Sequence, residues 1–166
     1  MPGAVSDSST LIHLAKIGRL NLLHEFHEKI LVAPAVWKEV VEEGQSWPGS
    51  SELKEARRSG WIEVAAPANQ ALVHLLQKDL HAGESETIAL AVECSADIVF
   101  LDESEARMTA RIYGLNKSGV IGILIRARRE GKIPSLQEEL DRLRNDAGFW
   151  IAEELYRKAL GAVDED

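Results

Sequence analysis

The sequence predicts an α/β fold in which helices cover a mainly parallel sheet on both sides. Short runs of small and β-branched residues alternate along the chain with longer stretches of helical periodicity. Two of these apolar runs, 3–6 and 97–101, each lead directly into an acidic residue and a helix start, at Asp7 and Asp102. Continuous apolar runs of this kind are typical of buried parallel strands.

The other elements follow the same alternation. Apolar residues at helical spacing from Leu11 to Phe26, interrupted at Gly18, predict two short helices. Further strands are expected at 30–33 and, with the period-two alternation of an edge strand, at 61–65. Further helices are expected at 35–43, 52–59, 69–80, 83–92, 103–113, 120–129 and after a capping box at 135–138, with a turn or short strand at 114–119 and a last helix after Gly148 that holds Phe149, Ile151 and Leu155.

Length and composition indicate one domain. The chain has 166 residues, 45% of them apolar, which suits a single domain over 1–160. The last residues, 161–166, are acidic and outside any periodic pattern, so we expect a flexible tail. No apolar run is long enough to span a bilayer and the N-terminus lacks a signal-peptide pattern, so we expect a cytoplasmic protein.

The charge and the cysteine content exclude several classes of function. A net charge of −8 argues against a generic nucleic-acid binder with a uniformly positive surface, so any such contact must be local and assisted by metal ions. Cys94 is the only cysteine, which excludes a disulfide framework and a thiolate zinc cluster.

Asp7 and Asp102 are the first candidate site residues. In open α/β sheets, ligands bind beyond the carboxyl ends of the strands where the strand order reverses, so these acids meet if their strands are parallel neighbours. Each acid also has a purely structural interpretation. Asp7 could cap the helix that follows it, and Asp102 with Glu105 fits a variant of the capping box.

Few other carboxylates are predicted to face this crevice: Glu39, Glu84 or Glu86, and Glu103. Glu84 and Glu86 could instead stabilise the first turn of their helix, and Glu39 could lie on the surface. A cluster of inward carboxylates would repel one another and requires cations. Oxygen ligands without cysteine or a histidine motif favour Mg²⁺ or Mn²⁺, ions that bind phosphate oxygens and activate water, so phosphodiester hydrolysis is the expected reaction class.

These acids stand in motifs whose order resembles that of PIN domains. The similarity runs from about Val5 to Leu160, including the late Gly131-Lys132-Ile133 and the aromatic Phe149-Trp150. The chain resembles the subgroup with a Gly-Glu-x-Glu third motif and extended C-terminal helices. The motifs are Val5-Ser6-Asp7-Ser8-Ser9, Val32-Ala33-Pro34-Ala35-Val36-Trp37-Lys38-Glu39-Val40, Gly83-Glu84-Ser85-Glu86-Thr87-Ile88-Ala89, and Phe100-Leu101-Asp102-Glu103 continued by Glu105-Ala106-Arg107 and Gly119-x-x-Gly122-x-Leu124.

The resemblance implies a three-layer α/β/α sandwich with a metal-dependent ribonuclease site. By motif position, Asp7 and Asp102 would hold the principal Mg²⁺ or Mn²⁺ ion, Glu86 would assist, Glu39 would orient a water or a second ion, and Glu103 would be a reserve ligand. The third acid of the family is usually Asp, whereas this chain offers Glu86 with Glu84 as its competitor. Toxins of toxin–antitoxin pairs are common in the family, which implies an RNA substrate, a small antitoxin protein as a partner and a homodimer.

Basic and aromatic residues supply candidate RNA contacts. Arg107 and Arg111 lie one helical turn apart and could bind phosphate, and a second basic cluster includes Arg126, Arg128, Arg129 and Lys132; both sets could also be solvated helix faces. Trp47 and Trp61 could stack on bases or pack in the core or at a dimer contact.

Two other functions compete with the nuclease. One is a non-catalytic PIN-like module for RNA binding or assembly, which the acidic net charge and the substituted third acid favour. The other is an aspartyl-phosphate phosphotransferase, which would need a second Asp two residues after Asp7, where Ser9 stands.

Overall fold

The computed structural model of the chain describes residues 3–43, 47 and 49–165. Within these residues, strands and helices alternate as predicted. The elements are β1 (Ala4–Ser6), α1 (Ser8–Lys16), α2 (Asn21–Phe26), β2 (Ile30–Val32), α3 (Pro34–Trp37), the π-helix η1 (Lys38–Glu42), α4 (Gly49–Arg58), β3 (Ile62–Val64), α5 (Gln70–Leu76), α6 (Ala82–Glu93), β4 (Ile98–Phe100), α7 (Ser104–Ile112), β5 (Lys117–Ser118), α8 (Val120–Arg129), α9 (Leu136–Asn145) and α10 (Glu153–Ala162).

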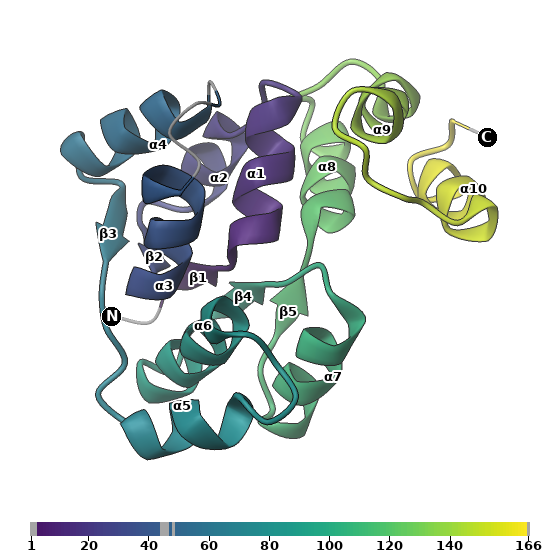
Figure 1. Cartoon of the computed structure of the whole chain (residues 1–166). Coiled ribbons are helices and arrows are strands. Elements are labelled where there is room, and N and C mark those ends of the chain that lie inside the picture. The colour runs from purple at the N-terminus through teal and green to yellow at the C-terminus, as the bar shows by residue number, and fades with distance from the viewer. Residues whose placement is uncertain (1–2, 44–46, 48, 166) are drawn as a thin grey trace.

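The sheet has five strands in the order β3-β2-β1-β4-β5, and every neighbouring pair is parallel. Helices α1, α2 and α8 lie on one face of the sheet, and α5, α6 and α7 lie on the other (Figure 1). This arrangement confirms the predicted three-layer α/β/α sandwich. The strand order reverses between β1 and β4, so the crevice where ligands bind in such sheets lies at the carboxyl ends of these two strands.

The central strands are short and apolar because both of their faces are covered. All three residues of β1 are buried, and Val99 and Phe100 of β4 are buried beside them. Helices α1 and α6 bury Leu11 and Ile88 completely in the same core. Core residues cover both faces of these two strands. The strands therefore meet solvent only at their ends, and the chain places polar residues there.

The helix predicted at 35–43 is divided into α3 and η1. In η1 the backbone N–H of Glu43 donates to the carbonyl of Lys38, 2.8 Å away, which is the i to i+5 spacing of a π-helix. Such single-turn insertions change the direction of the side chains around them and occur often at functional sites. Glu39 lies in this turn.

The last helix begins at Glu153, so the prediction that it includes Phe149 and Ile151 is wrong. Gly148 has a φ of +69°, and the N–H of Phe149 donates to the carbonyl of Leu143, 3.0 Å away. The left-handed glycine and this bond, which reaches back six residues along the chain, turn the backbone away from α9. The segment 149–152 is therefore non-helical.

The chain after α10 returns to the end of α8 and the start of α9. One carboxylate oxygen of Glu165 accepts from the backbone N–H of Leu136 at 2.7 Å and pairs with Arg128 at 2.8 Å. These bonds and others from Ser135 and Gln137 lower the pKa of Glu165. Residues 161–165, predicted as a flexible tail, thus contribute a cap to the N-terminus of α9.

Among the residues described, no helix has both the length and the apolar character needed to cross a membrane.

Candidate active site

Asp7 and Asp102 lie next to each other at the switch point of the sheet. Ser6 of β1 pairs with Phe100 of β4, and the N–H of Asp7 donates to the carbonyl of Phe100 at 3.1 Å. Thr10 connects the two carboxylates: its N–H donates to Oδ1 of Asp7 at 3.0 Å, and its hydroxyl donates to Oδ2 of Asp102 at 2.8 Å. The two strand-end acids therefore meet as expected from parallel pairing.

The environment of Asp7 disfavours its charged form. Asp7 is the N-cap of α1, so its structural interpretation also holds, but its side chain is only 2% exposed. Burial raises the pKa of Asp7 from 3.8 to about 8, and the negative charge of Asp102 adds to the increase. The hydrogen bonds from Thr10 and Asp102 lower the pKa and only partly offset these effects. Without a cation, the pair carries less than its full charge.

Asp102 does not act as the first residue of a capping box on α7. The N-cap of α7 is Glu103, whose side chain makes no capping hydrogen bond. Oδ1 of Asp102 instead accepts from the N–H of Val120 at the start of α8, 3.0 Å away. The capping-box interpretation of Asp102 with Glu105 is therefore wrong, because the carboxylate bonds a helix that is adjacent in space rather than in sequence.

Gly119 provides the space for this carboxylate. A Cβ atom at Gly119 would lie 2.4 Å from Oδ1 of Asp102 and 3.1 Å from Nη1 of Arg107. Arg107 is held there because its Nη1 donates to the carbonyl of Leu101 at 3.1 Å. The glycine of the Gly119-x-x-Gly122 motif thus allows α8, Asp102 and Arg107 to approach one another closely.

We expect Gly119→Ala to reduce any activity of the acid pair at least tenfold, because Asp102 must move to make room for the methyl group. Gly3→Ala is the matched control, since a Cβ atom there would have no heavy atom within 4 Å. Initial rates of RNA cleavage, with circular dichroism to verify the fold, measure the difference. Equal rates for Gly119→Ala and Gly3→Ala would contradict this role of Gly119.

Glu39 reaches the start of α1 from the π-helix. The hydroxyl of Ser8 donates to its Oε1 at 2.7 Å, and a Cβ atom on Gly83 would lie 3.3 Å from the same oxygen. Although Glu39 is an exposed residue, this oxygen is directed toward Asp7's helix and the beginning of α6. The structure thus brings the second-motif acid to the residue next to Asp7.

Glu84 and Glu86 have different surroundings. Glu84 is 5% exposed; burial raises its pKa, and the charges of Glu103 and Glu105 raise it further, while His81, 3.4 Å away, lowers it. Glu86 is half-buried, and its Oε1 accepts from the N–H of Ala35 at 3.1 Å, in the first turn of α3. Glu84 is therefore the acid whose charge is coupled to the neighbouring carboxylates, and Glu86 caps a helix. Glu103 itself is exposed at the rim.

A cavity of about 1010 Å³ opens beside Asp102. Its walls include Arg107 and Arg111, the predicted phosphate contacts, together with residues that the sequence analysis did not select: His13, Phe149 and Trp150. The rings of His13 and Phe149 meet edge to face with centroids 4.8 Å apart, which fixes the C-terminal segment against α1. His13 lies six residues after Asp7, in no recognisable motif. Phe149 and Trp150 belong to the family resemblance, but the predicted last helix gave them no role at the site.

The donor set fits a Mg²⁺-type ion at the acid pair. No three or more His, Cys, Asp or Glu side chains in the described part of the chain form a group that could hold an ion. Mg²⁺, however, is usually bound through one or two carboxylates, with waters and substrate phosphates completing its coordination. Asp7 and Asp102 supply two such carboxylates, and the burial and mutual repulsion that raise the pKa of Asp7 are the effects that a bound cation would offset.

A comparison with known protein families agrees with the fold and the position of the acids. The family model DUF3368, described as a PIN domain, matches residues 3–165. No curated protein is detectably similar in sequence. A match over nearly the whole chain, together with a five-stranded parallel sheet whose central strands end in acids, establishes the family. The chain belongs to the PIN domain family.

Proposed function

We propose that this protein is a Mg²⁺- or Mn²⁺-dependent endoribonuclease that hydrolyses phosphodiester bonds in RNA. PIN domains are generally nucleases and typically use divalent metal ions. The observation that carries the proposal is the contact of Asp7 and Asp102 through Thr10, because two carboxylates placed together in a buried crevice favour binding of a divalent cation. The cavity beside Asp102 gives a polymeric substrate access to that carboxylate, behind which Asp7 is buried.

The acids divide into two roles in this proposal. Asp7 and Asp102 would hold the ion, which polarises a phosphate oxygen and promotes ionisation of a water when bound. Thr10 and the N–H of Val120 hold the carboxylate of Asp102 in a fixed orientation. Glu39, fixed by Ser8, would orient the attacking water, and Glu103 stays a reserve ligand at the rim.

For the third acid we propose Glu84 in place of Glu86. Glu84→Gln should lower the cleavage rate by about tenfold to a hundredfold, the effect expected when a group that supports metal binding or proton transfer is removed. Glu86→Gln should leave the rate within about twofold of wild type, because an amide oxygen can still accept from Ala35. Steady-state cleavage of one RNA by both variants makes the comparison. A large loss in Glu86→Gln with none in Glu84→Gln would reverse the assignment.

The direct test of the proposed function is the metal requirement of RNA cleavage. A labelled single-stranded RNA incubated with purified protein should be cut internally in Mg²⁺ or Mn²⁺ and stay intact in EDTA. Products should reappear when the metal is restored in excess. Cleavage that persists in EDTA, or intact RNA under every metal condition, would contradict the proposal.

A second candidate is a PIN-like module that binds RNA or assembles with other proteins without catalysis. It is favoured by one observation, that the described acids form no group of three or more metal-binding side chains. The metal-dependence experiment separates the two functions, because such a module would bind RNA and leave it intact.

The proposed RNA substrate leads to proposals for the cellular role, the compartment and the partners of the protein. An RNA-cleaving protein of this family could be the toxin of a toxin–antitoxin pair, acting in the cytoplasm, where its substrate is found. A small antitoxin partner and a homodimer stay predictions. Co-purification with the product of a neighbouring small reading frame would test the first, and light scattering of the purified chain would test the second.

A further inference from the structure

Trp150 is an exposed aromatic residue on the wall of the cavity beside the acid pair. Its side chain is 82% exposed, and Met108 on the same cavity is 67% exposed. The other tryptophans have partners: the Trp47 indole N–H donates to the carbonyl of Val40, Trp61 stacks on His24, and Arg57 lies over Trp37. Packing in the described fold therefore accounts for those three rings but not for Trp150.

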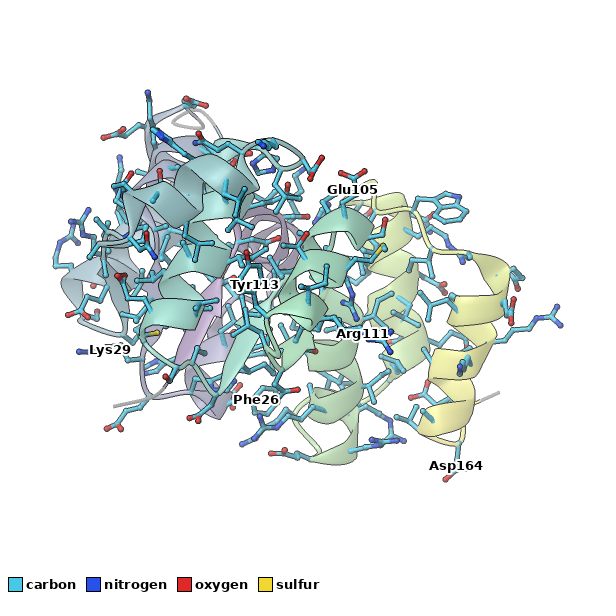
Figure 2. The ribbon with its side chains drawn as sticks, turned by 90° about the horizontal axis from the view of Figure 1, so that it is seen from below. Phe26, Lys29, Glu105, Arg111, Tyr113 and Asp164 are labelled. Carbon is cyan, nitrogen blue, oxygen red and sulfur yellow. The ribbon has the colours of Figure 1, made fainter. Side chains whose placement is uncertain are left out.

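The same cavity carries positive charge without carboxylate partners. Arg107 and Arg111 of α7 and Lys117 of β5 line it together with two carboxylates, Asp102 and Glu103. Within residues 3–43, 47 and 49–165 none of the three cations forms an ion pair with these or any other acids. Five of the other arginines in the C-terminal half are paired with glutamates: Arg126 with Glu130, Arg128 with Glu165, Arg142 with Glu139, and Arg144 and Arg157 with Glu153. The sixth, Arg129, donates to the carbonyl of Ala162. Figure 2 shows Arg111 on the side of α7 that faces the C-terminal helices.

We propose that this cavity is a binding groove for single-stranded RNA, in which a base stacks on Trp150 and the phosphates lie along Arg111 and Lys117. The inference rests on the proposed function, because the groove leads to Asp102 and would deliver the strand to the acid pair. A positively charged groove with aromatic platforms is the usual means of binding single strands without sequence readout. The bases of a duplex are stacked inside it and are not available to a tryptophan on the protein surface.

The local charge favours RNA over a protein as the occupant. The chain has a net charge of −8, so unpaired cations gathered in one groove are a local exception to its surface. Backbone phosphates complement the three cations of the cavity, and the apolar Met108 and Trp150 on the same lining suit the flat faces of bases. A second copy of this acidic chain would bring mostly negative charge to the same site.

The test is a binding measurement that does not depend on cleavage. Fluorescence anisotropy of a labelled single-stranded RNA of about ten nucleotides, in EDTA, gives the affinity of each variant. Trp150→Ala should weaken binding about tenfold, the loss expected for one stacked base, whereas Trp150→Phe should stay close to wild type. Leu75→Ala is the matched control, because Leu75 is 53% exposed and lies on α5, outside the cavity.

The cationic contribution has its own readout. Arg111→Gln should weaken binding and reduce the slope of log affinity against log salt by about 0.7, the value for one phosphate contact on a single strand. Arg58→Gln, at an exposed arginine of α4 paired with Glu55, should change neither. Circular dichroism of each variant verifies the fold.

Three results would overturn the groove. The first is an unchanged RNA affinity in Trp150→Ala, and the second is an equal loss of affinity for a duplex of the same length. The third is a change of oligomeric state in Trp150→Ala with unaltered RNA affinity, which would make this face a contact between copies. Binding that depends on Trp150 without any metal-dependent cleavage would support the groove and contradict the nuclease, so the two proposals fail separately.

Discussion

Asp7→Asn is expected to abolish RNA cleavage and to stabilise the metal-free protein at the same time. Asparagine is as good an N-cap as aspartate, so the hydrogen bond from Thr10 to the side chain at position 7 can persist. The substitution removes one of the two carboxylates proposed to hold the ion. It also removes the buried group whose ionisation is opposed by burial and by Asp102.

The stability effect depends on pH in a defined direction. The folded protein binds the Asp7 proton more tightly than the unfolded chain, because its pKa is raised from 3.8 to about 8. The stability associated with this proton is complete below about pH 4 and is lost as the pH rises toward 8. Asp7→Asn keeps this stability at every pH, so its advantage in unfolding free energy should grow from near zero at pH 4 to on the order of 5 kcal/mol at pH 8.

Thermal melts in EDTA across this pH range, combined with cleavage assays in Mg²⁺, measure both effects. Asp97→Asn is the control, because Asp97 is exposed and precedes β4, at the opposite end of the strand from Asp102. Its stability should show no comparable dependence on pH, and its cleavage rate should be unchanged. A cleavage rate near wild type in Asp7→Asn would contradict the catalytic assignment, and a lower stability at pH 8 would contradict the electrostatic one.

Glu139→Gln is expected to have the largest effect on stability among the charged residues of the C-terminal helices. Glu139 is 3% exposed, and its carboxylate binds Arg19 through two hydrogen bonds of 3.0 and 2.8 Å and Arg142 at 3.1 Å. Removing its charge leaves two guanidinium groups without their shared partner. Because both arginines reach solvent, we expect a loss of about 2 kcal/mol in unfolding free energy, below the range for fully buried pairs.

Denaturant unfolding measures this loss, and Glu138→Gln is the matched control, an exposed neighbour on the same helix. The loss of stability should also affect the groove, because the segment that carries Phe149 and Trp150 follows α9 and is hydrogen-bonded to it. An equal midpoint for Glu139→Gln and Glu138→Gln would show that this ion-pair network contributes nothing measurable.

The sheet and its two strand-end acids could be predicted because they depend on local signals. A buried strand is apolar along its length, a helix start is rich in Asp, Ser and Thr, and parallel pairing then brings Asp7 and Asp102 together without further information. The family resemblance added the order of the motifs, which the match over residues 3–165 supports.

The choice between Glu84 and Glu86 could not be predicted from the sequence. Both lie near the start of α6, where helix periodicity and the dipole give similar expectations. Their difference arises from α3, whose first turn offers an N–H to Glu86 and leaves Glu84 buried near Glu103. Which acid meets that N–H depends on how two helices pack, and the sequence carries no local signal for it.

The groove was missed for a similar reason. The apolar residues Phe149, Ile151 and Leu155 suggest a helix, but the positive φ at Gly148 and the bond from Phe149 to Leu143 turn the chain after α9 and leave residues 149–152 non-helical. Trp47 and Trp61, considered as base-stacking residues, contact Val40 and His24, whereas Trp150 was noted only as part of the family resemblance. Because the predicted start of the last helix was four residues too early, Trp150 was not identified from the sequence as an exposed residue of the cavity.

The most direct test of the account is calorimetric titration of the metal-free protein with Mn²⁺ at pH 7, in buffers with different ionisation enthalpies. We predict saturable binding at the Asp7–Asp102 pair with release of close to one proton, because Asp7 is largely protonated at that pH before an ion binds. Asp7→Asn should bind Mn²⁺ at least tenfold more weakly and release no proton. The absence of saturable binding, or equal affinity in wild type and Asp7→Asn, would contradict the claim that these two carboxylates share a metal ion.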